Sequence, residues 1–274
     1  MKWASITGAI LMGVIQGLTE FLPVSSSGHL VVGSHILELA KPSLLFDVIL
    51  HLGTLLPVLW LYRKEVGQMV VALGALPRFS ERWQEDAGLR LLVSVFIGSI
   101  PTALLGLGAQ DLFESLFSST KAVSITFAIT GCILMVTRFR PGYMAEDDSG
   151  FKTLNWWRAL VVGTVQGLAI TPGISRSGST IAVALLIGVE RQYAARLSFL
   201  MSVPAILGAV ALLILKSDAA SWTWAFSAGF VASVISGYIA LRLVVGLVRR
   251  GAMHWFALYL WPLSAALIVY TFFR

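Results

Sequence analysis

Long apolar stretches alternate with short polar segments along most of the 274-residue chain. A helix needs about 20 consecutive apolar residues to cross the hydrocarbon core of a bilayer, and shorter apolar pieces belong to buried or re-entrant segments. Six stretches approach or exceed that length. The pattern therefore predicts about six transmembrane helices, at roughly 46–62, 90–109, 121–137, 195–215, 223–245 and 254–273.

Two further apolar regions, 4–40 and 158–189, are each interrupted by a cluster of proline, glycine and hydroxyl residues. The interruptions fall at Pro23–Gly28 and at Thr171–Gly178. Short apolar pieces on both sides of such a breaker predict re-entrant helix-loop-helix hairpins that enter and leave the membrane by one face. Since non-helical backbone at membrane depth requires surrounding protein or water, we expect a polar cavity at both breaks.

The two interrupted regions are copies of one unit, which excludes a secretory signal as the explanation of the first. Duplicated broken helices are typical of folds whose site lies at the interface between repeats. The sequence predicts one membrane domain, 1–274, with repeat one at about 1–137 and repeat two at about 155–274. Residues that match at an offset of 150 are Gly13, Gln16, Gly17, Leu18, Ser25, Ser27 and Gly28 with Gly163, Gln166, Gly167, Leu168, Ser175, Ser177 and Gly178.

Composition and charge support a membrane protein and indicate its orientation. Only 12% of residues are charged, against about 25% in soluble domains. The loops 63–90, 138–158, 190–196 and 242–250 hold 14 of the 20 lysines and arginines. The positive-inside rule places these loops in the cytoplasm and both termini outside. The first hairpin then enters from outside and the second from inside, as an inverted-topology repeat requires. The net charge of +6 is therefore attributed to loops, and no nucleic-acid partner is expected.

Ionisable residues inside the apolar regions are found at the two breaks. Glu20 and His29 flank the first break, and Arg176 lies in the second. A charge inside a bilayer costs at least about 2.5 kcal/mol, so such residues usually face a cavity and mark a functional site. An alternative is that Glu20 and Arg176 only neutralise each other and lock the hairpins together. That alternative leaves the surrounding hydroxyl groups unexplained.

Around the first break, the residue types suit phosphate chemistry. Gln16 and Glu20 lie four residues apart on one helix face, where they could converge on a divalent cation. The serines 25–27 precede a helix whose first N–H groups favour an anion, although a serine run is also a common N-cap. His29 lies about one turn from Ser26, close enough to exchange a proton with a hydroxyl group.

In the second copy, Arg176 stands between Ser175 and Ser177, with Thr180 close behind. A guanidinium group binds phosphate through two parallel hydrogen bonds, and hydroxyl groups add single bonds. The acid, the base and the candidate nucleophile occur only in the first copy, and the extra positive charge only in the second. This asymmetry favours an enzyme. The lone histidines His35, His51 and His254 are interpreted as packing or interfacial residues.

The motifs at 16–29 and 172–180 resemble those of the undecaprenyl pyrophosphate phosphatase family of bacteria, also called bacitracin-resistance proteins. This chain has glutamine at position 16, where the family has glutamate or glutamine. The resemblance implies an all-α protein of the bacterial inner membrane that removes the terminal phosphate from undecaprenyl pyrophosphate at the outer face. It also implies Mg²⁺ or Ca²⁺, recycling of the lipid carrier for cell-wall glycan synthesis, and bacitracin resistance.

We hypothesise that Glu20, with help from Gln16, holds the cation and that the second break binds the terminal phosphoryl group. Three nucleophiles stay open: Ser26 activated by His29, His29 itself, or water.

The strongest rival function is a polyprenyl-phosphate carrier, because inverted broken-helix repeats are a transporter architecture. Expected partners are the polyprenyl pyrophosphate and membrane lipid, and a homodimer is an open alternative. The candidate catalytic residues are Glu20, Ser26, His29 and Arg176; the candidate substrate-binding residues are Gln16, Ser25, Ser27, Ser175, Ser177 and Thr180.

Overall fold

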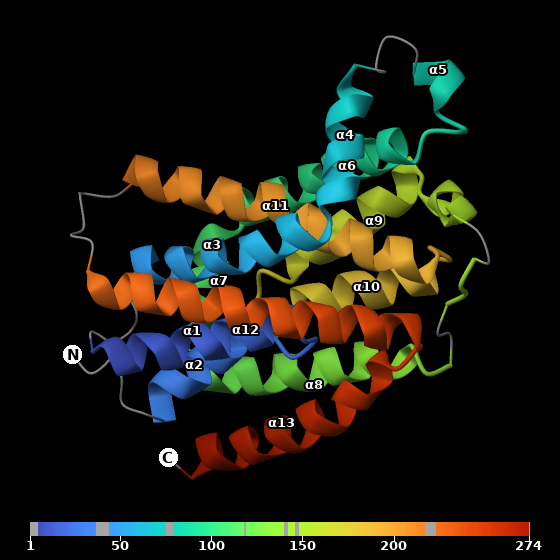
Figure 1. The fold of residues 1–274 in the computed structure, drawn as a ribbon. Coiled ribbons are helices and arrows are strands. Elements are labelled where there is room, and N and C mark those ends of the chain that lie inside the picture. The colour runs from blue at the N-terminus through green and yellow to red at the C-terminus, as the bar shows by residue number, and fades with distance from the viewer. Residues whose placement is uncertain are drawn as a thin grey trace.

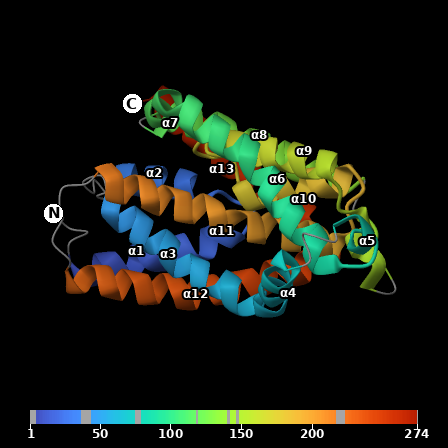
Figure 2. The same ribbon diagram turned by 90° about the horizontal axis from the view of Figure 1, so that it is seen from above.

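The computed structural model describes residues 5–36, 44–74, 79–117, 119–139, 142–145, 148–216 and 223–273. Every regular element in these ranges is a helix, and most of the long helices run side by side (Figure 1). Figure 2 shows two groups: α1, α3, α11 and α12 run nearly parallel, and α6, α8, α9 and α13 slant across them. The all-α architecture expected from the sequence is confirmed.

Each of the six predicted membrane spans corresponds to a helix. Four are long and apolar enough to cross a bilayer unaided, and the number rises to six if two bent helix pairs each count as one span. In one bent pair, α4 (Arg63–Leu73) leaves the axis of α3 at 80°. The six helices are α3 (Leu44–Leu61), α6 (Ala87–Gly108), α8 (Thr120–Val136), α11 (Arg191–Lys216), α12 (Trp224–Arg249) and α13 (Ala257–Phe272).

Short helices that the apolar pattern did not predict join or extend these spans. They are α4, α5 (Phe79–Arg82), α7 (Gln110–Phe117) and the 3₁₀ turns Asp148–Thr153 and Met253–Phe256. Their polar residues interrupt the hydrophobic pattern, so a search for long apolar runs overlooks them.

Both re-entrant hairpins have the predicted helix-break-helix form. In the first, α1 (Ile6–Phe21) is followed by α2 (Ser26–Ile36), and in the second α9 (Trp156–Leu168) is followed by α10 (Arg176–Leu186). The outermost residues of the first predicted hairpin, 4 and 37–40, lie outside the described residues. Helix α1 ends next to Pro23, because a residue that precedes proline is disfavoured in the helical conformation. The breaks therefore result from local sequence.

Each hairpin packs mainly against a helix from the other half of the chain. Helix α1 packs on α12, and α9 packs on α6. The repeated glycines permit this close approach: Gly13 lies against the backbone of Gly229, and Gly163 lies against the backbone of Gly98. Small residues serve the same purpose in many membrane helix pairs. Packing of each hairpin on a helix from the other half fits two intertwined repeats. The division into repeats at 1–137 and 155–274 stays a prediction.

Replacing Gly163 by leucine is expected to destabilise the fold. The added Cβ would lie 2.0 Å from the carbonyl oxygen of Gly98, which belongs to rigid helix backbone. Overpacking of this kind costs about 3 kcal/mol, and thermal unfolding in detergent would measure it. Gly208→Leu on α11 is the matched control, since an added Cβ there meets nothing within 4 Å. Equal unfolding midpoints for the two variants would contradict the close packing of α9 on α6.

The described parts of the four basic loops lie at one end of the bundle, on the right of Figure 1. Arg191 donates to the carbonyl oxygen of Arg249 at 2.9 Å, and Arg196 forms an ion pair with Glu65 at 3.1 Å. Arg90 donates to the carbonyl oxygens of Lys152 and Leu154. The first residues of α1 and the last residues of α13 lie at the opposite end. The charge segregation read from the sequence is thus a property of the fold.

Candidate active site

The two breaks touch each other near the middle of the bundle. Ser177 donates its hydroxyl to the carbonyl oxygen of Phe21 at 3.0 Å, and the N–H of Gly173 donates to Ser25 Oγ at 3.1 Å. A Cβ added at Gly28 would lie 2.9 Å from the Cα of Gly173. Only glycine fits at that contact. Two segments about 150 residues apart in sequence therefore form one junction.

Helix α8 holds the second break in place. Thr126 donates its hydroxyl to the carbonyl oxygen of Pro172 at 2.6 Å, and Thr130 donates to that of Gly173 at 2.9 Å. Thr130 also accepts from the N–H of Ser175 at 3.2 Å. Irregular backbone inside a membrane needs such partners. The sequence analysis missed both threonines, although two hydroxyls one turn apart in an apolar helix were a usable signal.

Ser25 has a strained backbone. Its φ is +68°, and it is the one non-glycine residue with positive φ among the described residues. A conformation of this kind persists when the surrounding structure holds it, and it often marks a functional site. Here Ser25 Oγ accepts from Gly28 at 3.3 Å and from Gly173 at 3.1 Å. The hydroxyl therefore joins the first break to the second.

Glu20 and Arg176 form an ion pair across the two hairpins. The Nη2 of Arg176 donates to Oε1 of Glu20 at 2.5 Å, and the two side chains are only 17% and 8% exposed. The Nη1 of Arg176 is buried and lacks a hydrogen-bond partner among the described residues. Buried polar atoms are nearly always paired, so this nitrogen is suited to a ligand. A phosphate oxygen fits a guanidinium edge of this kind.

The second carboxylate oxygen of Glu20 gathers three more side chains. Ser26 donates its hydroxyl to Oε2 at 2.7 Å, and Gln16 donates its amide at 3.1 Å. The Nε2 of His51 lies 3.7 Å from the same oxygen. Glu20 therefore contacts side chains from both hairpins and from α3.

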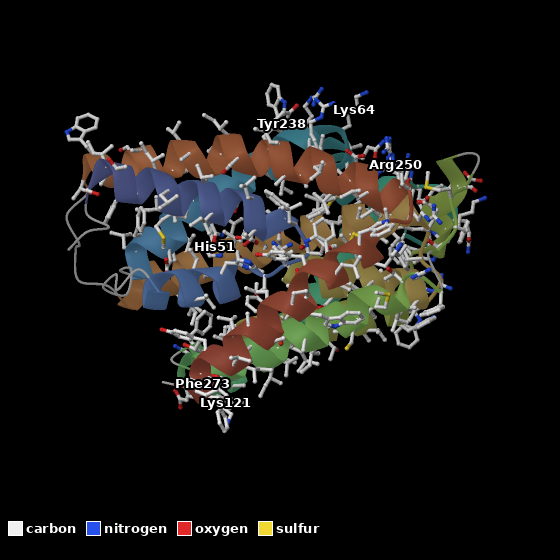
Figure 3. All side chains as sticks on the ribbon, turned by 90° about the horizontal axis from the view of Figure 1, so that it is seen from below. His51, Lys64, Lys121, Tyr238, Arg250 and Phe273 are labelled. Atoms are coloured by element: carbon white, nitrogen blue, oxygen red, sulfur yellow. The ribbon has the colours of Figure 1, made fainter. Side chains whose placement is uncertain are left out.

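The structure places His51 beside Glu20, whereas the sequence analysis interpreted it as a packing or interfacial residue. It comes from α3 and is labelled in Figure 3, and its side chain is 34% exposed. Its Nδ1 forms a hydrogen bond with the carbonyl oxygen of Asp47 at 2.8 Å. Asp47 and His51 are ionisable residues in an apolar helix, which is itself a functional signal. The analysis overlooked them because it concentrated on the two breaks.

His29 is not paired with Ser26, contrary to expectation. The Nδ1 of His29 is 2.8 Å from the carbonyl oxygen of Ser25, and its Nε2 is 2.8 Å from the hydroxyl of Tyr259 on α13. The first contact follows from helix geometry, because a side chain on α2 reaches back to the carbonyl four residues earlier. Ser26 contacts Glu20 instead.

The remaining candidates occupy two kinds of position. Ser175 Oγ caps α10 by accepting from Gly178 at 3.1 Å, and Ser27 contacts Ser25 at the junction. Thr180 is fully buried, and its hydroxyl lies 2.6 Å from that of Ser198 on α11. The structure therefore uses the Thr180 side chain for packing between α10 and α11, although it was expected to contact phosphate.

The donor set near Glu20 suits a hard cation in part. Gln16 Oε1 is buried and lacks a hydrogen-bond partner among the described residues, beside a carboxylate. Within the same residues, no three His, Cys, Asp or Glu side chains come together as a metal site. Magnesium commonly binds one or two protein oxygens and completes its shell with phosphate and water. Gln16 and Glu20 fit that pattern.

The fold and the junction define the class of protein. It is a polytopic membrane protein in which two broken-helix hairpins form a buried site with the donors that an anion requires. The chain belongs to the bacitracin resistance protein BacA family, because the model of that family matches residues 9–266. The resemblance seen in the motifs is thereby confirmed.

Several relatives of similar length carry the name undecaprenyl-diphosphatase. That of Desulfatibacillum aliphaticivorans is 40% identical over 282 aligned positions, which cover 99% of this chain and all of the relative. That of Carboxydothermus hydrogenoformans is 43% identical, with 95% of each chain covered. That of Methanobrevibacter smithii is 39% identical, with 93% of this chain and 94% of the relative covered. The similarity extends over nearly the whole chain.

Proposed function

We propose that the protein hydrolyses undecaprenyl diphosphate to undecaprenyl phosphate and inorganic phosphate, and so recycles the lipid carrier and confers bacitracin resistance. The observation that carries this proposal is the convergence of Glu20, Ser26 and Arg176 at the junction of the two breaks. The relatives named undecaprenyl-diphosphatase support the choice of substrate. Positioning and charge neutralisation supply most of the catalysis in phosphoryl transfer.

Each polar group at the junction has a part in this reaction. Arg176, with the N–H groups at the start of α10, binds the terminal phosphoryl oxygens. Ser26 Oγ attacks the terminal phosphorus while its proton passes to Glu20. The bridging P–O bond breaks, undecaprenyl phosphate leaves, and water then hydrolyses the phosphoserine to release phosphate and restore Ser26. This pathway assigns to Glu20 the role of base, which one of the three alternatives left open by the sequence had given to His29.

A divalent cation would be held by Glu20 and Gln16, and when bound it would neutralise charge on the diphosphate. Mg²⁺ and Ca²⁺ are both compatible with oxygen donors. The site residues themselves bind and orient the substrate.

The proposed location is the bacterial inner membrane, with the basic end of the bundle in the cytoplasm. The first hairpin would then open to the outer side, where the lipid diphosphate is expected. Assembly as a homodimer stays a prediction.

Phosphate release by the purified protein in detergent tests the proposal. The substrate is undecaprenyl or farnesyl diphosphate, with Mg²⁺ or Ca²⁺ and with a chelator in a parallel sample. We expect release that depends on the cation. A folded sample that releases no phosphate would contradict the enzyme and favour the carrier, which reconstitution into liposomes with labelled polyprenyl phosphate would then examine.

Arg176→Lys is expected to lower kcat by about 10²-fold, the typical cost of losing one well-placed donor to a transition-state oxygen. Lysine keeps the positive charge beside Glu20 but lacks the planar fork of donors. Phosphate release measures the effect. Arg250→Lys, at the exposed end of α12 (Figure 3), is the control. Activity within threefold of wild type for Arg176→Lys would show that charge alone suffices.

A further inference from the structure

The imidazole of His29 is fixed on three sides. Its Nδ1 contacts the carbonyl oxygen of Ser25, and its Nε2 contacts the hydroxyl of Tyr259, each at 2.8 Å. The ring of Phe127 lies against it with a centroid distance of 5.2 Å, and the ring of Tyr259 is nearly parallel to it at 5.9 Å.

These contacts determine which ring nitrogen carries the proton. A carbonyl oxygen only accepts hydrogen bonds, so Nδ1 of His29 donates to Ser25. In a neutral ring, Nε2 is then the acceptor, and the hydroxyl of Tyr259 donates to it. Tyr259 thus selects one tautomer and one orientation of His29, as the second partner of a histidine commonly does.

The contacts of His29 connect Tyr259 to Ser25, the residue with the strained backbone. Tyr259 holds His29, His29 holds the carbonyl group of Ser25, and the hydroxyl of Ser25 accepts from Gly173 in the second break. Ser25, whose φ is +68°, immediately precedes Ser26. Because strained backbone persists only where its neighbours hold it, the position of Ser26 depends on this chain of hydrogen bonds.

We propose that Tyr259 is a positioning residue, which acts through His29 to hold the first break in its reactive geometry. The proposal rests on the proposed phosphatase function. Tyr259 comes from α13, far from both motifs in sequence, and 48% of the residue is exposed at the side of the bundle. It contacts His29 directly and Ser26 only through His29 and Ser25. It should therefore affect turnover more than substrate affinity.

Tyr259→Phe tests the proposal because it keeps the stacked ring and removes only the hydroxyl group. We expect kcat to fall about fivefold, which is within the range that one hydrogen bond provides, while KM changes less than twofold. In a His29→Ala background the same change should have no effect, since Tyr259 acts through His29. Tyr238→Phe is the control, because the hydroxyl that it removes accepts from Arg242 on the same helix α12, away from both breaks.

Two kinetic results would overturn the proposal. One is wild-type kcat in Tyr259→Phe. The other is a fall of the same size in the presence and in the absence of the His29 imidazole. Thermal unfolding of each variant accompanies the kinetics, and a midpoint for Tyr259→Phe well below that of Tyr238→Phe would assign the effect to general stability, which also overturns the proposal.

A spectroscopic measurement separates this proposal from the proposed function. Nitrogen NMR of histidine-labelled protein, with His29 assigned by its loss in His29→Ala, reports hydrogen bonding at Nε2. Tyr259→Phe should shift that resonance and leave the other histidines unchanged. An unchanged resonance would refute the positioning role whatever the enzyme assay shows. A shifted resonance in a protein without phosphatase activity would refute the proposed function and leave the Tyr259–His29 contact established.

Discussion

Glu20→Gln is expected to lower the rate of phosphate release by about 10³-fold, within the range for loss of a general base. The variant keeps the size of the side chain and one oxygen acceptor. It loses the negative charge and one of the two carboxylate oxygens that accept from Arg176 and Ser26. Its new amide group would also point a donor toward one of those two donors. Phosphate release from the purified variant, compared with the wild type at saturating substrate, measures the effect.

Two further variants accompany this experiment: a control, and a test of whether the ion pair is only structural. Asp111→Asn on α7 removes an exposed carboxylate far in sequence from both breaks and should leave activity unchanged. Glu20→Gln combined with Arg176→Gln replaces the buried ion pair by two amides, and such neutral replacements often keep or raise stability. If the pair only locked the hairpins together, the double variant would be active. We expect a folded and inactive protein.

Ser26→Ala is expected to reduce turnover by at least about 10³-fold, because removal of a nucleophile abolishes covalent catalysis and leaves only the contribution of binding. The structure supports attack by Ser26, since its hydroxyl already donates to a carboxylate at 2.7 Å. Activity within tenfold of wild type would remove Ser26 from that role. Ser99→Ala is the control, since the Ser99 hydroxyl donates to the carbonyl oxygen of Val95 within its own helix α6.

Trapping the intermediate distinguishes the remaining nucleophiles. Acid quenching during turnover of substrate labelled in the terminal phosphate should leave label on Ser26, because a phosphoserine survives acid. A phosphohistidine is lost in acid and survives base, so label stable only in base would identify His29. Turnover without any protein-bound label would favour water.

The apolar pattern and two short motifs were sufficient to predict much of this fold. The six spans correspond to helices, because a bilayer requires about 20 apolar residues per helix. The breaks at Pro23 and Pro172 were visible because proline, glycine and serine act within a few residues. The clustering of basic loops at one end followed from their alternation along the chain. All of these features depend on neighbours in sequence.

Several contacts at the junction could not be predicted in the same way. Tyr259 comes from a helix whose sequence gives no sign that it faces a break, and Thr130 was overlooked although its hydroxyl lies one turn from that of Thr126. His51 was interpreted as a packing residue, yet it lies 3.7 Å from Glu20. Thr180 was assigned to phosphate, yet it packs against Ser198. Each of these contacts depends on which helix lies opposite a given side chain.

The sequence alone therefore determined that this is a membrane protein with two similar broken-helix segments, and it predicted Glu20, Ser26 and Arg176 as candidate site residues. Their partners were decided only by packing in three dimensions. Ser26 bonds to Glu20 and His29 bonds to Tyr259, whereas spacing along α2 had suggested that Ser26 and His29 would pair. The physical reason is that helix periodicity fixes the face on which a side chain lies, but the neighbour on that face depends on how distant helices pack.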